Sequence, residues 1–170
     1  MSNLRMVQLT AEPVTPDAWA PFGWLPRPDT DPADGEQTLR FEWSDPHLNV
    51  IAHAYDEVEH TETGALCTVM YRHDTHTQAL MPINCDAIVV VAPAQVDFSE
   101  PAHLDTVRAF LVRPLDVFVL HQGTWHWGPF PLGPDPVRLL NVQGLRYAED
   151  NRSVDLGEAA GSAVEVAVPA

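Results

Sequence analysis

The sequence predicts an all-β fold, an antiparallel sandwich or barrel with one or two short helices. The first observation behind this is that 16 prolines are spread along the 170 residues, and no long amphipathic helical pattern fits between them. The second is a series of short segments that are rich in β-branched and apolar residues and are separated by turn residues, a pattern typical of antiparallel sandwiches. These segments span residues 48–55, 65–73, 77–83, 87–92, 106–113, 116–121 and 137–143.

Two segments ahead of these strands have patterns of their own. The stretch "TPDAWAPFG", residues 15–23, predicts a short helix, because Thr15 suits the N-cap, Pro16 suits the first helical position and Gly23 ends the pattern. The acidic, proline-containing stretch "PRPDTDPADGEQ", residues 26–37, indicates a loop.

The length of the chain fits one domain, which we expect to span residues 1–170 and to bury roughly 70% of the surface of the unfolded chain. The C-terminal tail, residues 157–170, has little pattern, although its "VEVAV" predicts an edge strand or a swapped strand. The opening "MSNLRMVQLTAEP" lacks the apolar segment of an export signal, and no apolar run is long enough to span a membrane. We therefore expect a cytoplasmic protein.

The charge of the chain narrows the classes of function. A formal net charge of −15, from 24 acidic and 9 basic residues, repels nucleic acids and anionic membrane surfaces, so neither is an expected partner. The chain contains no lysine, which excludes a lysine Schiff base and a GKS phosphate-binding loop. A small anionic substrate would have to be held by local arginines or histidines.

The stretch "YRHDTHTQALMPI", residues 71–83, gathers His73, His76 and Gln78 immediately before an apolar run. Imidazole exchanges protons near neutral pH and is also a common metal ligand. Whether His76 lies beside His73 depends on a turn at "DTH". A lone histidine is usually a surface or core residue, but three such groups within six residues favour a functional site.

A second group lies in "LHQGTWHWGPF", residues 120–130. Strand alternation places His126 on the opposite side from Trp125 and Trp127. The plain alternative is that both tryptophans fill the core and His126 is simply exposed.

These motifs resemble the ureidoglycolate lyase family, formerly called ureidoglycolate hydrolases. The segments "RHDTHTQALMP", "VRAFLV" and "HQGTWH" follow the order and spacing of that family's motifs, and "LTAEPVTPDAWAPFG" is similar to its opening. The resemblance covers roughly residues 8–156. It implies a cupin fold, a small β-barrel or jelly roll whose mouth holds the site and which usually forms a homodimer. It also implies cleavage of ureidoglycolate to glyoxylate and urea in purine (allantoin) breakdown.

The chain departs from the family pattern at several positions. Tyr71, Asp74 and His76 replace a glutamate, a proline and a glycine, and Trp127 replaces the second histidine of Gly-Thr-Trp-His-His. Farther along, "LLNVQGLR", with Gln143, replaces a segment with an acid and an arginine, and His53 stands where the family has an arginine. These departures leave the identity of the substrate open.

The reaction implied by the resemblance requires a base, an acid and a partner for the substrate carboxylate. His73 and His126 are the candidate proton-transfer residues, and Gln78 is a candidate to orient the ureido or carboxylate group.

For each of the remaining candidate substrate-binding residues except His53, a structural role is the alternative. Arg72 and Arg108 match arginines of the family, although strand alternation places Arg72 on the opposite face from His73. Both are candidates for a bidentate carboxylate contact, or for structural ion pairs. Trp125 would either shield the site or fill the barrel, and His53 is a further candidate.

Two other interpretations stay open. In the first, His73, His76 and His126, with His121 nearby, bind a divalent metal such as nickel in a metal-dependent cupin enzyme. In the second, the chain is a repurposed cupin that binds a small polar ligand without catalysis, which the change to Trp127 would suit.

Overall fold

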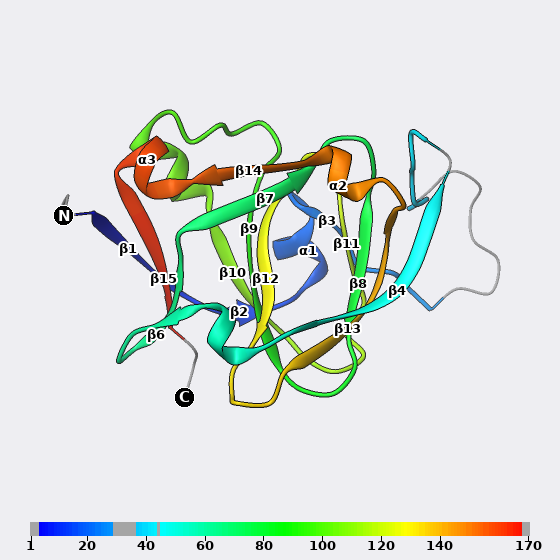
Figure 1. Ribbon diagram of the computed structural model, residues 1–170, viewed down its shortest axis with the longest axis horizontal. Helices are drawn as coiled ribbons and strands as arrows, with labels where there is room; N and C mark the ends of the chain where they lie inside the picture. The colour runs from blue at the N-terminus through cyan, green and yellow to red at the C-terminus, as the bar shows by residue number, and fades with distance from the viewer. Residues whose placement is uncertain (1–3, 29–36, 44, 168–170) are drawn as a thin grey trace.

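The computed structural model describes residues 4–28, 37–43 and 45–167. Within these residues the strands form three sheets that stack as a β-sandwich (Figure 1). The four-stranded sheet is ordered β1 (Arg5–Thr10), β15 (Ser162–Ala167), β6 (Gly64–Cys67) and β5 (Glu59–His60). The six-stranded sheet is ordered β14 (Asn151–Asp155), β7 (Val69–His73), β12 (Trp125–Pro131), β9 (Ala87–Ala92), β10 (Arg108–Val112) and β2 (Glu12–Pro13). The five-stranded sheet is ordered β3 (Gly23–Trp24), β11 (Phe118–Leu120), β8 (Gln78–Pro82), β13 (Val137–Gly144) and β4 (Pro46–His53).

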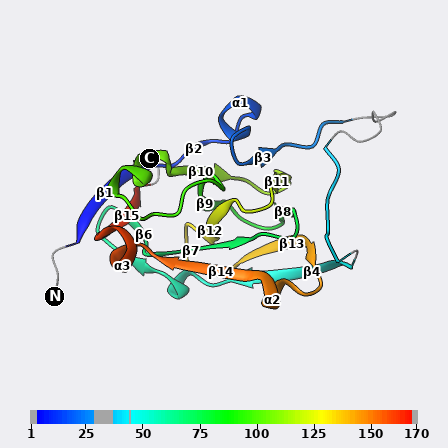
Figure 2. The same ribbon diagram turned by 90° about the horizontal axis from the view of Figure 1, so that it is seen from above.

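The all-β prediction is confirmed, with two corrections. The described strands do not close into a barrel, because they divide into three separately ordered sheets. The described helices also exceed the expected one or two. They are α1 (Pro16–Trp19), α2 (Tyr147–Asp150), α3 (Leu156–Ala160) and the 3₁₀ turns η1 (Tyr55–Glu57) and η2 (Pro101–Thr106). Helices α1 and α2 lie on opposite sides of the molecule (Figure 2), and none of the described helices is long and apolar enough to span a membrane.

Strand β9 joins the two halves of the core. All its residues are buried, and alternate side chains enter different apolar clusters: Ile88 and Val90 join one, while Val89 and Val91 join the other. This follows from the period of two of a β-strand and explains why "AIVVVA" is apolar throughout. The strand therefore fixes the positions of its neighbours β12 and β10.

Each predicted strand segment contains a strand, with one division. The segment 65–73 contains both β6 and β7, because the chain leaves one sheet at Thr68, whose carbonyl oxygen accepts a hydrogen bond from the Leu156 backbone nitrogen, and enters another. The described strands outside the predicted segments are β1, β2, β3, β5, β12 and β14. The short helix is confirmed, and the Thr15 hydroxyl accepts a hydrogen bond from the backbone nitrogen of Ala18, as expected of an N-cap.

Two predictions concern the loop and the tail. Most of the predicted acidic loop, residues 29–36, lies outside the described residues, as do residues 168–170 of the tail. The expectation of an edge or swapped strand in the tail is wrong, because β15 lies between β1, which it pairs in parallel, and β6, which it pairs in antiparallel fashion. The residues of β15 are almost all buried, as expected of a strand that has another strand on each side.

Candidate active site

A cleft of about 490 Å³ opens among the three sheets. Side chains from β4, β7, β8, β12 and β13 line it, and His73, His126, Gln78 and Gln143 are among the buried polar ones. The inward positions of β7 alternate, so Val69, Tyr71 and His73 all reach this cleft. Two sequence motifs far apart in the chain therefore contribute to one concavity.

The predicted imidazoles come together. The ring centroids of His73 and His76 lie 4.6 Å apart, and those of His73 and His126 lie 5.5 Å apart. All three side chains are buried, with exposed fractions of 8%, 2% and 8%. The two histidine motifs thus form one cluster.

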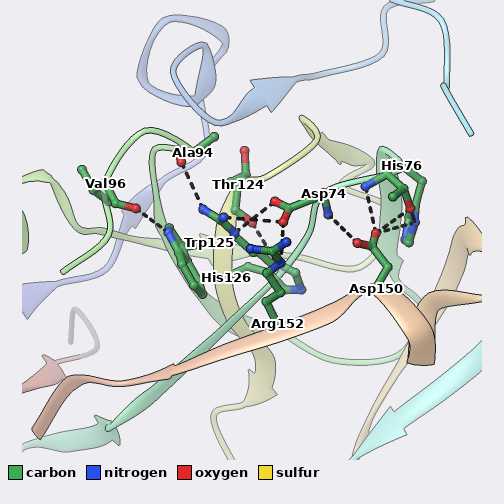
Figure 3. A network of polar contacts seen from close by, with 11 residues as sticks. Asp74, His76, Ala94, Val96, Thr124, Trp125, His126, Asp150 and Arg152 are labelled. Atoms are coloured by element: carbon green, nitrogen blue, oxygen red, sulfur yellow. Dashed lines mark hydrogen bonds and ion pairs between the residues drawn. The ribbon is translucent and has the colours of Figure 1, made fainter. Parts of the chain in front are cut away.

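The turn at "DTH" brings His76 back beside His73, and Asp150 holds this turn (Figure 3). The Asp150 carboxylate accepts hydrogen bonds from the backbone nitrogens of Asp74, at 3.1 Å, and Thr75, at 2.8 Å, and from the Thr75 hydroxyl at 2.6 Å. The same carboxylate lies 3.4 Å from Nδ1 of His76. Asp150 therefore fixes both the backbone and the ring.

Sequence reasoning did not find Asp150. The residue lies at the end of a four-residue helix, about 75 positions from the turn that it holds. The available signal was the displacement of an acid and an arginine that the family pattern carries near the C-terminus.

The ring nitrogens divide into engaged and free atoms. Nδ1 of His126 lies 3.1 Å from the carbonyl oxygen of Thr124, so it carries the proton and donates it, which leaves Nε2 with a free lone pair. Six buried side-chain atoms have no hydrogen-bond partner among the described residues, and three of them belong to this site: Nδ1 of His73, Nε2 of His76 and Oε1 of Gln78. These three residues and His126 also line a second, smaller cavity.

Burial keeps these imidazoles neutral. It lowers the pKa of His73 to about 3, helped by repulsion from His126 and His76, and the pKa of His126 to about 4. Burial also lowers the pKa of His76, against the attraction of Asp150 and Asp45. For Asp150, burial acts upward, but the hydrogen bonds from Thr75 and Asp74 lower its pKa overall. At neutral pH the cluster is a set of neutral nitrogens beside an ionised carboxylate.

This donor set fits a divalent metal ion. Neutral imidazoles are the form that binds metal, and at metal sites the other ring nitrogen is usually held by a carbonyl or carboxylate, as Thr124 and Asp150 hold two of these rings. Ligand atoms of His73, His76 and Asp150 all lie within 4.8 Å of one another. The predicted set had His126 in place of Asp150. Because the Asp150 oxygens already accept three hydrogen bonds, Asp150 also suits the role of a supporting residue.

Gln78 belongs to a row of amides that crosses the five-stranded sheet. Its Nε2 donates to Oδ1 of Asn141 at 2.9 Å and to Oε1 of Gln143 at 3.3 Å. Nδ2 of Asn141 in turn donates to Oδ1 of Asn49, its register partner on β4. The row gives Gln78 a fixed orientation in which its oxygen is the free group.

The structure places the Arg72 side chain outside the cleft. Its side chain leaves β7 on the face opposite His73, where Nε pairs with Oδ1 of Asp74 at 3.0 Å and the guanidinium lies 4.6 Å from the Trp125 ring. Alternation along the strand is the physical reason. Arg72 is therefore not among the residues that line the cleft.

Arg108 and Trp125 also lie elsewhere. Arg108 pairs with Glu12 at an exposed position. Trp125 packs in the core against Phe98 and donates its Nε1 proton to the carbonyl oxygen of Val96, so it fills the fold and does not shield the site. Arg108 therefore forms a structural ion pair, and Trp125 fills the core.

Two further histidines lie around the cluster. His53 lines the cleft at its rim, where Nδ1 lies 2.9 Å from Oε2 of Glu57. His121 lines the smaller cavity and lies 5.4 Å from Trp24 between ring centroids.

A family model described as ureidoglycolate lyase matches residues 6–164. No curated protein sequence matches the chain significantly. Among solved structures, a Bacillus subtilis oxalate decarboxylase with one glutamate changed to alanine is 14% identical over 59% of this chain, with a TM-score of 0.36. A form of the same enzyme with one tryptophan changed to tyrosine is 16% identical over 64% of this chain, also with a TM-score of 0.36. The chain spans only 30% and 28% of those two chains.

Proposed function

The chain belongs to the ureidoglycolate lyase family, and we propose that it is a carbon–nitrogen lyase of purine (allantoin) breakdown. Its substrate is ureidoglycolate or a related small hydroxy acid, and its products are glyoxylate and urea. The observation that carries this proposal is the pair of His73 and His126, whose rings lie 5.5 Å apart at one cleft. Both rings are close enough to contact a single small ligand.

The reaction removes the hydroxyl proton while the carbon–nitrogen bond breaks. The hydroxyl carbon becomes the aldehyde carbon of glyoxylate, and the electron pair of the broken bond and one proton go to the urea nitrogen. His126 is neutral with a free Nε2, so it accepts the hydroxyl proton, and His73 is the second imidazole able to exchange a proton. Gln78, held by Asn141 and Gln143, orients the substrate.

The low pKa values of these imidazoles make them weak bases, which favours help from a cation. In a metal-centred alternative, His73 and His76, together with His126 or Asp150, would instead hold a divalent ion such as nickel, and a histidine bound to the ion would not transfer a proton. When bound, the ion supplies positive charge to the hydroxyl and carboxylate oxygens. Its site is supported by the unpartnered nitrogens of His73 and His76.

The direct test is to incubate the purified protein with ureidoglycolate and to measure urea and glyoxylate, together with metal content before and after chelator treatment. We expect both products in equal amounts, and loss of their release in His126→Ala with unchanged circular dichroism. Full activity of His126→Ala would refute the assignment.

A second candidate is a small-ligand-binding protein without catalysis. The observation that favours it is that the described residues lining the cleft include no arginine, so the family's substrate has no cationic side chain there. A thermal-shift screen against ureidoglycolate, glyoxylate, sugars and divalent metals separates the candidates, because a ligand stabilises the folded state. Stabilisation by a sugar and not by ureidoglycolate would favour the binding protein.

A further inference from the structure

The cleft has an apolar wall in addition to its polar groups. We define this apolar wall as five partly exposed side chains that line the cleft from different strands and loops: Ile51, Val58, Leu66, Val69 and Phe130. Apolar side chains that share one concavity and stay partly exposed mark a surface that a ligand covers. The wall adjoins the histidine cluster, because Val69 shares its strand face with His73.

The size of the cleft exceeds the needs of a small two-carbon acid unit. Its volume of about 490 Å³ falls in the range of roughly 300–1,000 Å³ that is typical of pockets for much larger molecules. His73 follows Val69 by four positions on an extended strand, a distance of roughly 13 Å along the backbone. A ligand that reaches from the imidazoles to the wall must therefore be elongated.

The charges around the cleft point in the same direction. Its described lining includes the exposed acids Glu57 and Glu59 and no arginine, and the chain contains no lysine. Because the described lining offers no arginine or lysine to a small anion, apolar contact is the main source of affinity that the cleft itself offers.

We propose that the substrate carries an elongated apolar group on the carbon that bears the hydroxyl, and that this group packs on the apolar wall. The proposal rests on the proposed function for the identity of the reacting group. The substrate class is then a 2-hydroxy-2-ureido acid with an aliphatic or aromatic side chain. Breaking its carbon–nitrogen bond converts the hydroxyl carbon to the ketone of a 2-oxo acid, while urea leaves with the electron pair and one proton.

The test uses ligands that the protein cannot cleave. N-carbamoylglycine, N-carbamoylleucine and N-carbamoylphenylalanine share the ureido and carboxylate groups, lack the hydroxyl and differ only in the apolar group. Calorimetric titration should show affinity that rises along this series, by at least about tenfold from glycine to phenylalanine. Equal affinities for the three ligands would overturn the proposal.

The matched variants are Ile51→Thr with Val69→Thr in the wall, and Val50→Thr with Val154→Thr outside it. Val50 is the neighbour of Ile51 on β4, and Val154 lies on β14, which pairs with β7, but neither lines the cleft. The wall variant should reduce the gain along the series to less than about threefold, and the control should keep it. If the wall variant instead changes the sedimenting mass and leaves ligand affinity unchanged, the wall is a contact between copies of the chain and the proposal fails.

These outcomes separate the inference from the proposed function. Urea release from ureidoglycolate together with a flat affinity series would refute only the apolar substrate. A rising series without urea release from any hydroxy acid would refute only the lyase.

Discussion

The two faces of strand β7 differ in how their polar groups are partnered. On the outer face, Arg72 pairs with Asp74, donates to the carbonyl oxygen of Ala94 and lies over the Trp125 ring. On the inner face, His73 is more deeply buried, and its Nδ1 has no partner among the described residues. The two residues are adjacent in the chain, yet one is tied into the fold and the other keeps free hydrogen-bonding capacity.

Buried polar atoms that lack a partner indicate where a ligand or ion binds in this molecule. A buried polar atom without a partner destabilises a fold by about 1–3 kcal/mol, so a protein retains such atoms where something else compensates for them. The inner side has three of them, on His73, His76 and Gln78, around one small cavity. Paired arginines contribute to stability, whereas these unpaired atoms are available to a ligand or ion.

The sharpest test of this comparison replaces each neighbour in turn. His73→Ala should reduce urea release by roughly 10²–10⁴-fold, the usual effect of losing a positioned proton-transfer group, and should leave the fold intact. Arg72→Met should leave turnover within about threefold and lower the free energy of unfolding by about 1 kcal/mol, since a half-buried ion pair is lost. Turnover and urea denaturation, measured on both variants, show whether each residue serves catalysis or stability. A larger loss of turnover in Arg72→Met would invert the comparison.

A smaller effect is expected at Asp150, which supports the inner face without lining the cleft. Asp150→Asn should weaken metal binding by roughly 10–100-fold, because His76 loses the carboxylate that orients its ring. The ¹⁵N chemical shifts of His76 should report a changed tautomer, which a merely structural role would not produce. Asp155→Asn, at the N-cap of α3, is the matched control. An unchanged tautomer and unchanged metal affinity in Asp150→Asn would show that the carboxylate only holds the turn.

The smallest effect concerns the stability of the chelator-treated protein at acidic pH. His73 and His126 have folded pKa values of about 3 and about 4, below the ordinary value of 6.5, so between these limits the unfolded chain binds more protons than the folded one. The contribution of these two imidazoles to the free energy of unfolding is therefore fully present well above pH 6.5 and is lost as pH falls toward their folded pKa values. Each imidazole should account for about 2 kcal/mol between pH 7 and pH 5.

Urea denaturation at the two pH values measures this loss. His126→Gln should recover part of it, whereas His103→Gln, in η2 and away from the cluster, should not. Equal pH dependence of the wild type and His126→Gln would contradict the account.

Much of the fold follows from local sequence pattern. The segment "AIVVVA" is apolar at every position because a central strand packs on both faces. The predicted bounds, residues 87–92, are the observed bounds of β9. The strand β14, "NRSVD", has mostly exposed residues and no such pattern, so only its pairing with β7 identifies it. The position of β15 inside its sheet likewise depends on β1, from the other end of the chain.

The site shows the same division. His73, His76, His126 and Gln78 could be found because their spacing places them at strand ends, and strand alternation separated Arg72 from His73 in advance. Asp150 could not be placed, because its contact with the turn is set by tertiary structure over about 75 residues. Alternation on one strand also says nothing about other strands, so the distance of Arg108 from the cleft required the sheet order.

In the proposed mechanism, His73 and His126 act on one ligand as a unit. A double-mutant cycle on urea release tests it most directly, with His73→Ala, His126→Ala and the double variant compared under the same conditions. Residues that act together are not additive, so the double variant should lose no more than about threefold beyond the less active single variant. Losses that multiply across the two positions would show that the two imidazoles work independently.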